Sequence, residues 1–169
     1  MNQRVRSVAV VFTAVTAACA HPEATPSPGT PGDPVPIVRL RAEPYSFAFY
    51  SGLENPDRIV VRDQALWQAV WAQIYSRQSR VAPVPAIDFS QEMLVVVALG
   101  TRSSGGYGIL VNGASEGQSA GLVVTVRSIS PGRSCGRTAA LTQPIDIARV
   151  PRREGNLSFV EQSQVTDCG

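Results

Sequence analysis

The sequence predicts an α+β fold in which one amphipathic helix packs on a mainly antiparallel sheet of about six to seven strands. Three observations lead to this prediction. Residues 64–77 repeat apolar side chains at helical spacing, residues 93–99 form a continuous apolar run, and shorter segments around them alternate apolar and polar residues.

Residues 1–18 are typical of a secretory signal peptide. Arg4 and Arg6 precede an uncharged apolar run of about a dozen residues, which is too short to cross a hydrocarbon core that needs about 20 helical residues. Two processing routes remain open. The ending Ala17-Ala18-Cys19 resembles a lipobox and makes Cys19 a lipidated first residue, whereas Ala18-Cys19-Ala20 also fits an A-x-A cleavage site.

Residues 19–36 read as a semi-stiff tether, because proline recurs every few residues and apolar side chains are scarce. We therefore expect a membrane-anchored lipoprotein of the cell envelope, with a soluble periplasmic or secreted protein as the alternative. A single domain follows at 37–169.

The first half of that domain contains the helix. Residues 37–41, 45–50 and 59–61 are predicted strands. Asp63 is a good N-cap for a helix over about residues 64–77, whose apolar stripe faces the sheet. That stripe consists of Leu66, Trp67, Val70, Trp71 and Ile74, and we interpret the tryptophan pair as core packing.

The second half is predicted to be strands alone. Residues 93–99 are expected to form a central strand buried on both faces, followed by strands at 107–111 and 122–129 with a polar connector at 113–121. Strands at 145–150 and 157–160 are predicted to pair as a hairpin through the loop at 151–155.

The charge of the chain argues against nucleic acid as a partner. All basic residues are Arg, and without Arg4 and Arg6 of the signal the 15 basic residues become 13, equal to the 13 acidic residues. A neutral mature chain without a basic run has no electrostatic attraction for nucleic acid or acidic lipid. We expect contact with a membrane only through a lipid anchor.

The remaining cysteines are expected to be paired. Removal or lipidation of Cys19 leaves Cys135 and Cys168, an even pair in a compartment that permits disulfides. A bridge between them closes a loop of about 34 residues, worth roughly 4 kcal/mol in the chain-entropy model. Two free thiols are the alternative.

Catalytic residue types are scarce in this sequence. The one histidine, His21, lies in the tether, and there is no Lys, so a Ser or Cys nucleophile lacks its usual base and a metal lacks its commonest ligand. We expect no enzyme activity, no metal site and no cofactor. Carboxylates remain as a less favoured alternative, with Asp88, Glu92 and Asp146 as candidates.

The most distinctive segment joins two apolar strands with small and polar residues at 100–107. Its paired glycines permit positive φ, its backbone amides and Arg102 offer hydrogen-bond donors, and it is longer than a two-residue hairpin requires. We predict a binding loop made of Arg102, Ser103, Ser104, Gly105, Gly106 and Tyr107. The alternative is a tight hairpin whose glycines serve geometry alone.

The order of several weak motifs resembles the C-terminal domain of the PrcB family, described as protease complex subunits that are frequently lipoproteins. The similarity spans about residues 51–160. The motifs are Trp67-x3-Trp71, Ile87-Asp88-Phe89, Gly100, Gly105-Gly106-Tyr107 and Thr142-x-Pro144.

The resemblance implies a non-catalytic envelope protein that associates with an exported partner such as a protease. We therefore expect a binding module that assists or stabilises that partner. A lipoprotein that binds a small ligand or glycan is the alternative, followed by a carboxylate-only hydrolase.

Overall fold

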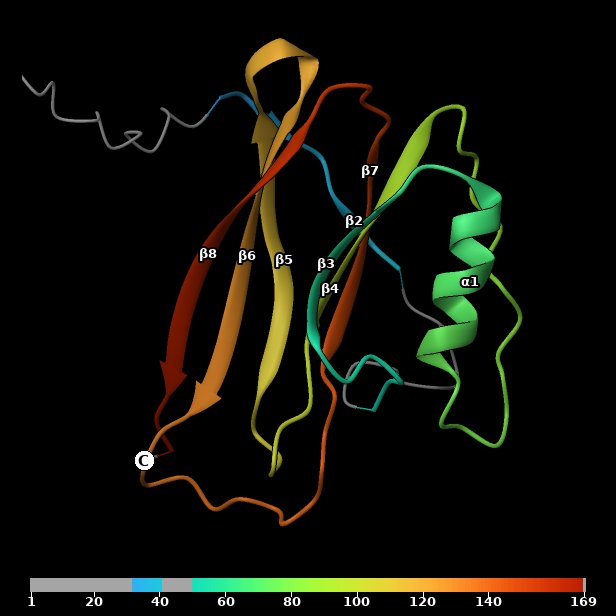
Figure 1. The fold of residues 1–169 in the computed structure, drawn as a ribbon. Coiled ribbons are helices and arrows are strands. Elements are labelled where there is room, and N and C mark those ends of the chain that lie inside the picture. The colour runs from blue at the N-terminus through green and yellow to red at the C-terminus, as the bar shows by residue number, and fades with distance from the viewer. Residues whose placement is uncertain (1–31, 41–49, 169) are drawn as a thin grey trace, which may run out of the picture.

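The computed structural model describes residues 32–40 and 50–168. Within them, one helix and eight strands form two four-stranded sheets that pack face to face (Figure 1). The first sheet has the order β1-β5-β6-β8 and the second has the order β2-β7-β4-β3. The predicted α+β class is confirmed, but the strands divide between two sheets where the sequence predicted one.

The elements have well-defined bounds. The helix α1 spans Gln64–Ile74, and a short 3-10 helix, η1, spans Gln118–Ala120. The strands are β1 Pro34–Val35, β2 Val38–Arg39, β3 Pro56–Val61, β4 Glu92–Leu99, β5 Gly108–Glu116, β6 Leu122–Pro131, β7 Ile145–Pro151 and β8 Leu157–Thr166.

Strand β4 explains why two sheets form. It pairs with β3 on one side and β7 on the other, and residues 93–98 have no exposed surface. Its even-numbered side chains, such as Leu94 and Val96, pack under the helix, whereas its odd-numbered ones, such as Val95 and Val97, pack against the other sheet. The continuous apolar run therefore serves two cores, because successive strand residues point to opposite faces.

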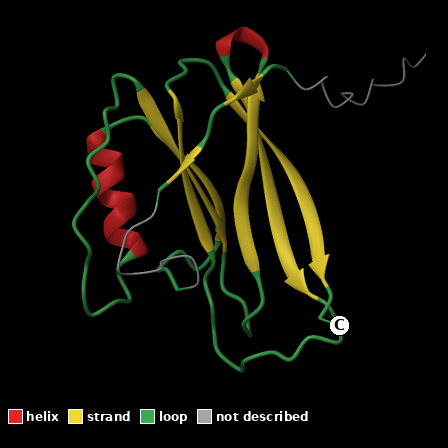
Figure 2. Cartoon of the chain, turned by 180° about the vertical axis from the view of Figure 1, so that it is seen from behind, coloured by secondary structure: helices red, strands yellow, loops and turns green. Residues whose placement is uncertain are grey.

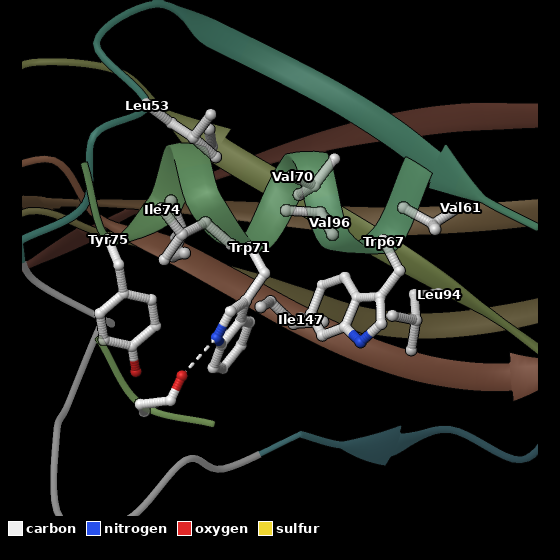
Figure 3. Packing of buried hydrophobic residues seen from close by; sticks show 13 residues of the cluster. Leu53, Val61, Trp67, Val70, Trp71, Ile74, Tyr75, Leu94, Val96 and Ile147 are labelled. Atoms are coloured by element: carbon white, nitrogen blue, oxygen red, sulfur yellow. Dashed lines mark hydrogen bonds between the residues drawn. The ribbon is translucent and has the colours of Figure 1, made fainter. Parts of the chain in front are cut away.

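The helix covers the face of the second sheet that points away from the first sheet (Figure 2). Asp63 caps it as predicted, since its carboxylate accepts a hydrogen bond from the backbone N–H of Leu66. Trp67, Trp71 and Tyr75 lie in a row on its buried side, with neighbouring ring centroids 5.0 and 4.9 Å apart (Figure 3).

The two indole N–H groups confirm that the tryptophans are core residues. Trp67 Nε1 donates to the carbonyl of Pro85 at 2.9 Å, and Trp71 Nε1 donates to the carbonyl of Ala82 at 2.9 Å. Both indoles are almost fully buried. These two hydrogen bonds attach residues 82–85 to the buried side of the helix. They also satisfy both indole N–H groups, as the burial of a tryptophan requires.

The predicted hairpin between β7 and β8 is wrong. Strand β7 already has β4 and β2 on its two edges, so the chain after Pro151 crosses to the other sheet. There β8 pairs with β6 in parallel over ten consecutive residues. Leu157 and Phe159 pack into the core between the sheets, which holds the strand in that position.

Other boundaries differ by smaller amounts. Strand β1 lies within the predicted tether and pairs with β5, so the folded part starts before residue 37. The helix ends at Ile74 where residue 77 was expected, and β5 continues through half of the predicted connector. The predicted signal peptide, Cys19, most of the tether and most of the predicted strand 45–50 lie outside the described residues.

Candidate protein-binding surface

The predicted binding loop connects the two sheets. Strand β4 ends at Leu99 in one sheet and β5 begins at Gly108 in the other, so these strands do not form a hairpin and the loop is not a hairpin turn. Gly100 and Gly106 have φ values of +76° and +89°, which glycine adopts at little cost. The length of the loop therefore reflects the crossing between sheets, and it is not by itself evidence of binding.

A second segment fixes the conformation of this loop. Arg102 and Thr142 exchange two backbone hydrogen bonds of 2.8 and 3.0 Å, and Gly105 N–H donates to the carbonyl of Thr138 at 3.0 Å. The hydroxyl of Thr142 donates to the carbonyl of Ser104 at 3.1 Å. Residues 101–107 and 133–142 thus form one continuous surface, which we call the two-loop surface.

The six predicted site residues differ in what they can contact. Ser103 and Gly106 are exposed, whereas Ser104 and Gly105 are half-buried against the second segment. The guanidinium of Arg102 lies 5.8 Å from the ring centroid of Tyr107, a cation–π arrangement. Tyr107 itself packs on the core between the sheets. The ring of Tyr107 therefore supports the guanidinium of Arg102 on its buried side. The side chains of this loop that a partner can reach are those of Arg102 and Ser103.

Sequence reasoning missed the second half of this surface. Residues 133–142 show no strand or helix periodicity, and nothing in their pattern indicated that they would pair with residues 102–105. They add Arg133, Arg137 and the exposed apolar run Ala139-Ala140-Leu141, in which Leu141 is 62% exposed. The available signal was the length of this segment together with Cys135 inside it.

The two-loop surface has a basic character. Arg102, Arg133 and Arg137 form no ion pair with any residue that the structure describes, whereas six other arginines do. Arg137 donates to backbone carbonyls of Pro131 and Gly132, which positions it. One carboxylate, Asp167, also lies at this end, next to Gly132. An excess of unpaired guanidinium groups beside an exposed leucine suits an acidic partner with some apolar surface.

A disulfide anchors the second segment. Cys135 and Cys168 are bridged as the sequence predicts, with their Cα atoms 4.9 Å apart. The bond joins this segment to the end of β8, and Gly132 N–H donates to the carbonyl of Thr166 at 2.8 Å beside it. The segment therefore has a covalent attachment near one end and contacts the predicted binding loop near the other.

The carboxylates proposed for the hydrolase alternative are not brought together. Asp88 accepts hydrogen bonds from the backbone and hydroxyl of Ser90, which lower the pKa of its carboxyl, and it stabilises a turn. Glu92 pairs with Arg149 at 3.2 Å. Asp146 accepts from Arg39 at 3.1 Å and from the N–H of Val111 at 2.8 Å, so it ties β7 to β5.

Two hollows occur elsewhere on the described part of the chain. One is lined by residues between β3 and the end of α1, among them Gly52, Asn55 and Gln73. The other lies beside η1 and is lined by residues including Gln118 and Asn156. Neither includes a residue of the two-loop surface.

The two-loop surface lies at the opposite end of the sheets from the point where the described chain begins. Asp33 accepts from the N–H of Glu116, at the last residue of β5, whereas the binding loop precedes its first residue, Gly108. The nine residues of β5 separate the two points by roughly 25–30 Å. Figure 1 shows them at opposite ends of the strand.

In the described residues, no helix has the length and apolar character needed to span a membrane. No curated protein and no solved structure matched this chain. Residues 93–151 match a family model described as PrcB C-terminal. This range runs from β4 to β7 and contains all of the two-loop surface. The central part of the chain therefore resembles the PrcB C-terminal family.

Proposed function

We propose that this chain is a non-catalytic binding module of the cell envelope, and that the two-loop surface binds an exported protein such as a protease. The observation that carries the proposal is the position of the family match. Both segments of the surface fall inside residues 93–151, and the resemblance to the PrcB family implies association with a protease complex.

The geometry supports protein binding at this surface. Its backbone is fixed by four hydrogen bonds between the two segments, so little conformational entropy is lost when a partner binds. It presents arginines next to exposed Leu141, and arginine is enriched at the energetic centres of interfaces. Recognition is commonly carried by loops on a rigid scaffold of this kind.

The point where the tether enters the domain is consistent with the proposed location in the envelope. If residues 1–18 direct export and Cys19 carries a lipid, the tether enters the domain near Asp33, at the end of β5 away from the two-loop surface. The surface then points away from the membrane. A soluble exported form presents the same surface without the anchor.

The test compares capture of envelope proteins by variants of the mature chain. Arg102→Ala removes the most central guanidinium, and we expect it to weaken partner capture about tenfold, since loss of a hot-spot contact costs more than about 1 kcal/mol. Arg102→Ala combined with Arg133→Ala and Arg137→Ala should abolish capture. Because these side chains lie on the surface, the thermal midpoint should change little.

Arg80→Ala is the matched control, since Arg80 is an exposed arginine in the segment that follows the helix and is not part of the two-loop surface. Equal capture by the triple variant and by this control would exclude the two-loop surface. Recovery of a glycan or small molecule, with no exported protein, would support the ligand-binding alternative, for which the hollow beside η1 is a candidate site.

A further inference from the structure

Among the residues that the structure describes, strand β8 is an unpaired sheet edge whose one usual form of protection is the charge of Glu161. The described sheets have four edge strands, and three of them are short or blocked: β1 and β2 have two residues each, and β3 carries Pro56, Asp57 and Arg58. Natural proteins block edges with proline, charge, bulges or short length. Strand β8 has ten residues without proline or bulge, and most of them are exposed.

The hydrogen-bonding groups at this edge can be identified from the ladder with β6. Leu122 N–H donates to the carbonyl of Asn156, and Gly132 N–H donates to the carbonyl of Thr166, one at each end of the ladder. Along a strand, the N–H and C=O groups of successive residues point alternately to one side of the strand and to the other. The even-numbered residues of β8 therefore direct theirs toward β6. The odd-numbered residues direct theirs to the free edge, and these are Leu157, Phe159, Glu161, Ser163 and Val165.

The single charge on this edge is already neutralised. Glu161 is the one charged residue of β8, and its carboxylate accepts hydrogen bonds from Arg58 Nε at 2.8 Å and from Arg58 Nη2 at 2.9 Å. An incoming strand therefore meets a carboxylate that Arg58 compensates, but two of these half-exposed carboxylates placed directly opposite each other still repel. The side chains of Val160 and Val165 are 44% and 63% exposed, and an added strand would cover this apolar surface.

We propose that β8 pairs with β8 of a second copy of this chain, antiparallel and about a two-fold axis at Gln162, to give one continuous eight-stranded sheet. This inference does not depend on the proposed function. Two-fold dimers are the commonest oligomers, and every copy already carries the required extended strand, whose one charge is paired with Arg58.

The sequence of β8 selects this register. In an antiparallel pair, residues that face each other have their side chains on the same face of the sheet. A two-fold axis perpendicular to the sheet preserves this face, whereas neighbouring residues of one strand point to opposite faces. The axis must therefore pass through a residue and not between two residues. Near the middle of β8, the axis can fall on Glu161 or on Gln162. An axis on Glu161 would place two carboxylates opposite each other, which is destabilising.

An axis on Gln162 avoids that repulsion. It pairs Glu161 with Ser163 and Phe159 with Val165, and all four residues direct their backbone groups to the free edge. These are hydrogen-bonded pairs, while Gln162 faces its own copy in a non-hydrogen-bonded pair with close side chains. The exposed Val165 then lies beside Phe159 of the second copy.

Cysteine cross-linking tests the register. Gln162→Cys places two thiols directly opposite each other in a pair with Cβ atoms about 4.5–5.5 Å apart, so we expect disulfide-linked dimers under mild oxidation. Gln164→Cys is the matched control, because its copy lies about 13 Å away along the strands. Peptide mapping under non-reducing conditions separates this bond from the native bridge.

Analytical ultracentrifugation of the exported mature chain tests the dimer without cross-linking. The unaltered chain should sediment as a dimer in a concentration-dependent way. Ser163→Pro removes an N–H that β6 does not use and should give a folded monomer with near-native circular dichroism. Ser163→Glu should do the same by opposing Glu161, whereas Ser158→Glu, which adds the same charge opposite Thr166, should remain dimeric.

A chain that is monomeric at all concentrations and forms no Gln162→Cys cross-link overturns the proposal. Equal cross-linking by Gln162→Cys and Gln164→Cys overturns the register. A monomer that instead binds an added synthetic peptide of residues 157–166 would show that the edge accepts strands but not a whole second copy, and this too contradicts the dimer.

Discussion

Gly100 ends the central strand in a conformation that other residues adopt only under strain. Its φ is +76°, and a Cβ at this position would lie 2.8 Å from the backbone nitrogen of Pro56. We predict that Gly100→Ala lowers the free energy of unfolding by roughly 1–3 kcal/mol, from backbone strain and the clash with β3. Chemical denaturation measures the loss.

Gly136 provides the control for this substitution. A Cβ there has no neighbour within 4 Å and its φ is not positive. Gly136→Ala should change the free energy of unfolding by less than about 0.5 kcal/mol. Equal effects at the two glycines would mean that the positive φ at Gly100 carries no strain.

The ion pair between Glu116 and Arg153 makes stability depend on pH. The hydrogen bond from Arg153 holds the pKa of the Glu116 carboxyl below its ordinary value of 4.5. Since the folded-state pKa is depressed, the stabilisation is present above pH 4.5 and is lost as the pH falls through the folded-state value. We predict that Glu116→Gln lowers the thermal midpoint at pH 7 and reduces its fall between pH 5 and pH 3.

Asp88 and Glu154 also have lowered pKa values, the first from Ser90 and the second from Arg152, so some acid sensitivity should remain in that variant. A Glu116→Gln variant with the full acid sensitivity of the unaltered chain would show that the pair does not contribute.

At the scale of elements, β8 depends on three attachments. It has β6 on one side, the Arg58–Glu161 ion pair toward the other sheet, and the disulfide at its end. We predict that the double substitution Cys135→Ser with Cys168→Ser costs about 2–4 kcal/mol. We expect β8 to separate from β6 before the rest of the domain unfolds, because β8 is an edge strand.

Hydrogen exchange measures that local loss. The amides of Gln164 and Thr166, which point to β6, should exchange faster in the double variant, while those of Val95 and Val96 in β4 should keep their protection. Unchanged protection at Gln164 and Thr166 would show that pairing with β6 alone secures the strand.

The predictability of these elements follows from how local their signals are. The helix and β4 could be predicted because Trp67, Val70 and Trp71 recur at helical spacing and residues 93–99 are uniformly apolar. The partners of the strands could not. Nothing in residues 157–166 indicates parallel pairing with β6, because that choice depends on which edges of the other strands are already occupied.

The candidate site was predictable in part for the same reason. The glycines and Arg102 identified the loop at 101–107, and the even cysteine count identified the bridge. The docking of residues 138–142 on that loop rests on backbone hydrogen bonds, which carry no side-chain signal. Tyr107 could not be assigned to core or surface until both sheets were in place.

At the scale of the whole molecule, the two sheets separate the point of chain entry from the two-loop surface by the length of β5. The helix covers one outer face, and the described residues leave β8 open at one side. The surface proposed for partner binding and the edge proposed for self-pairing are therefore different, so substitutions can address each one separately.

The most direct test of partner binding at the two-loop surface is site-specific photo-cross-linking in living cells. A photoreactive residue in place of exposed Ser103 should give an adduct with an exported protein, expected to be a protease, identified by mass spectrometry. The same residue in place of Gln68, on the exposed side of α1, should give no such adduct. An adduct at Gln68 with none at Ser103 or Leu141 would contradict the account.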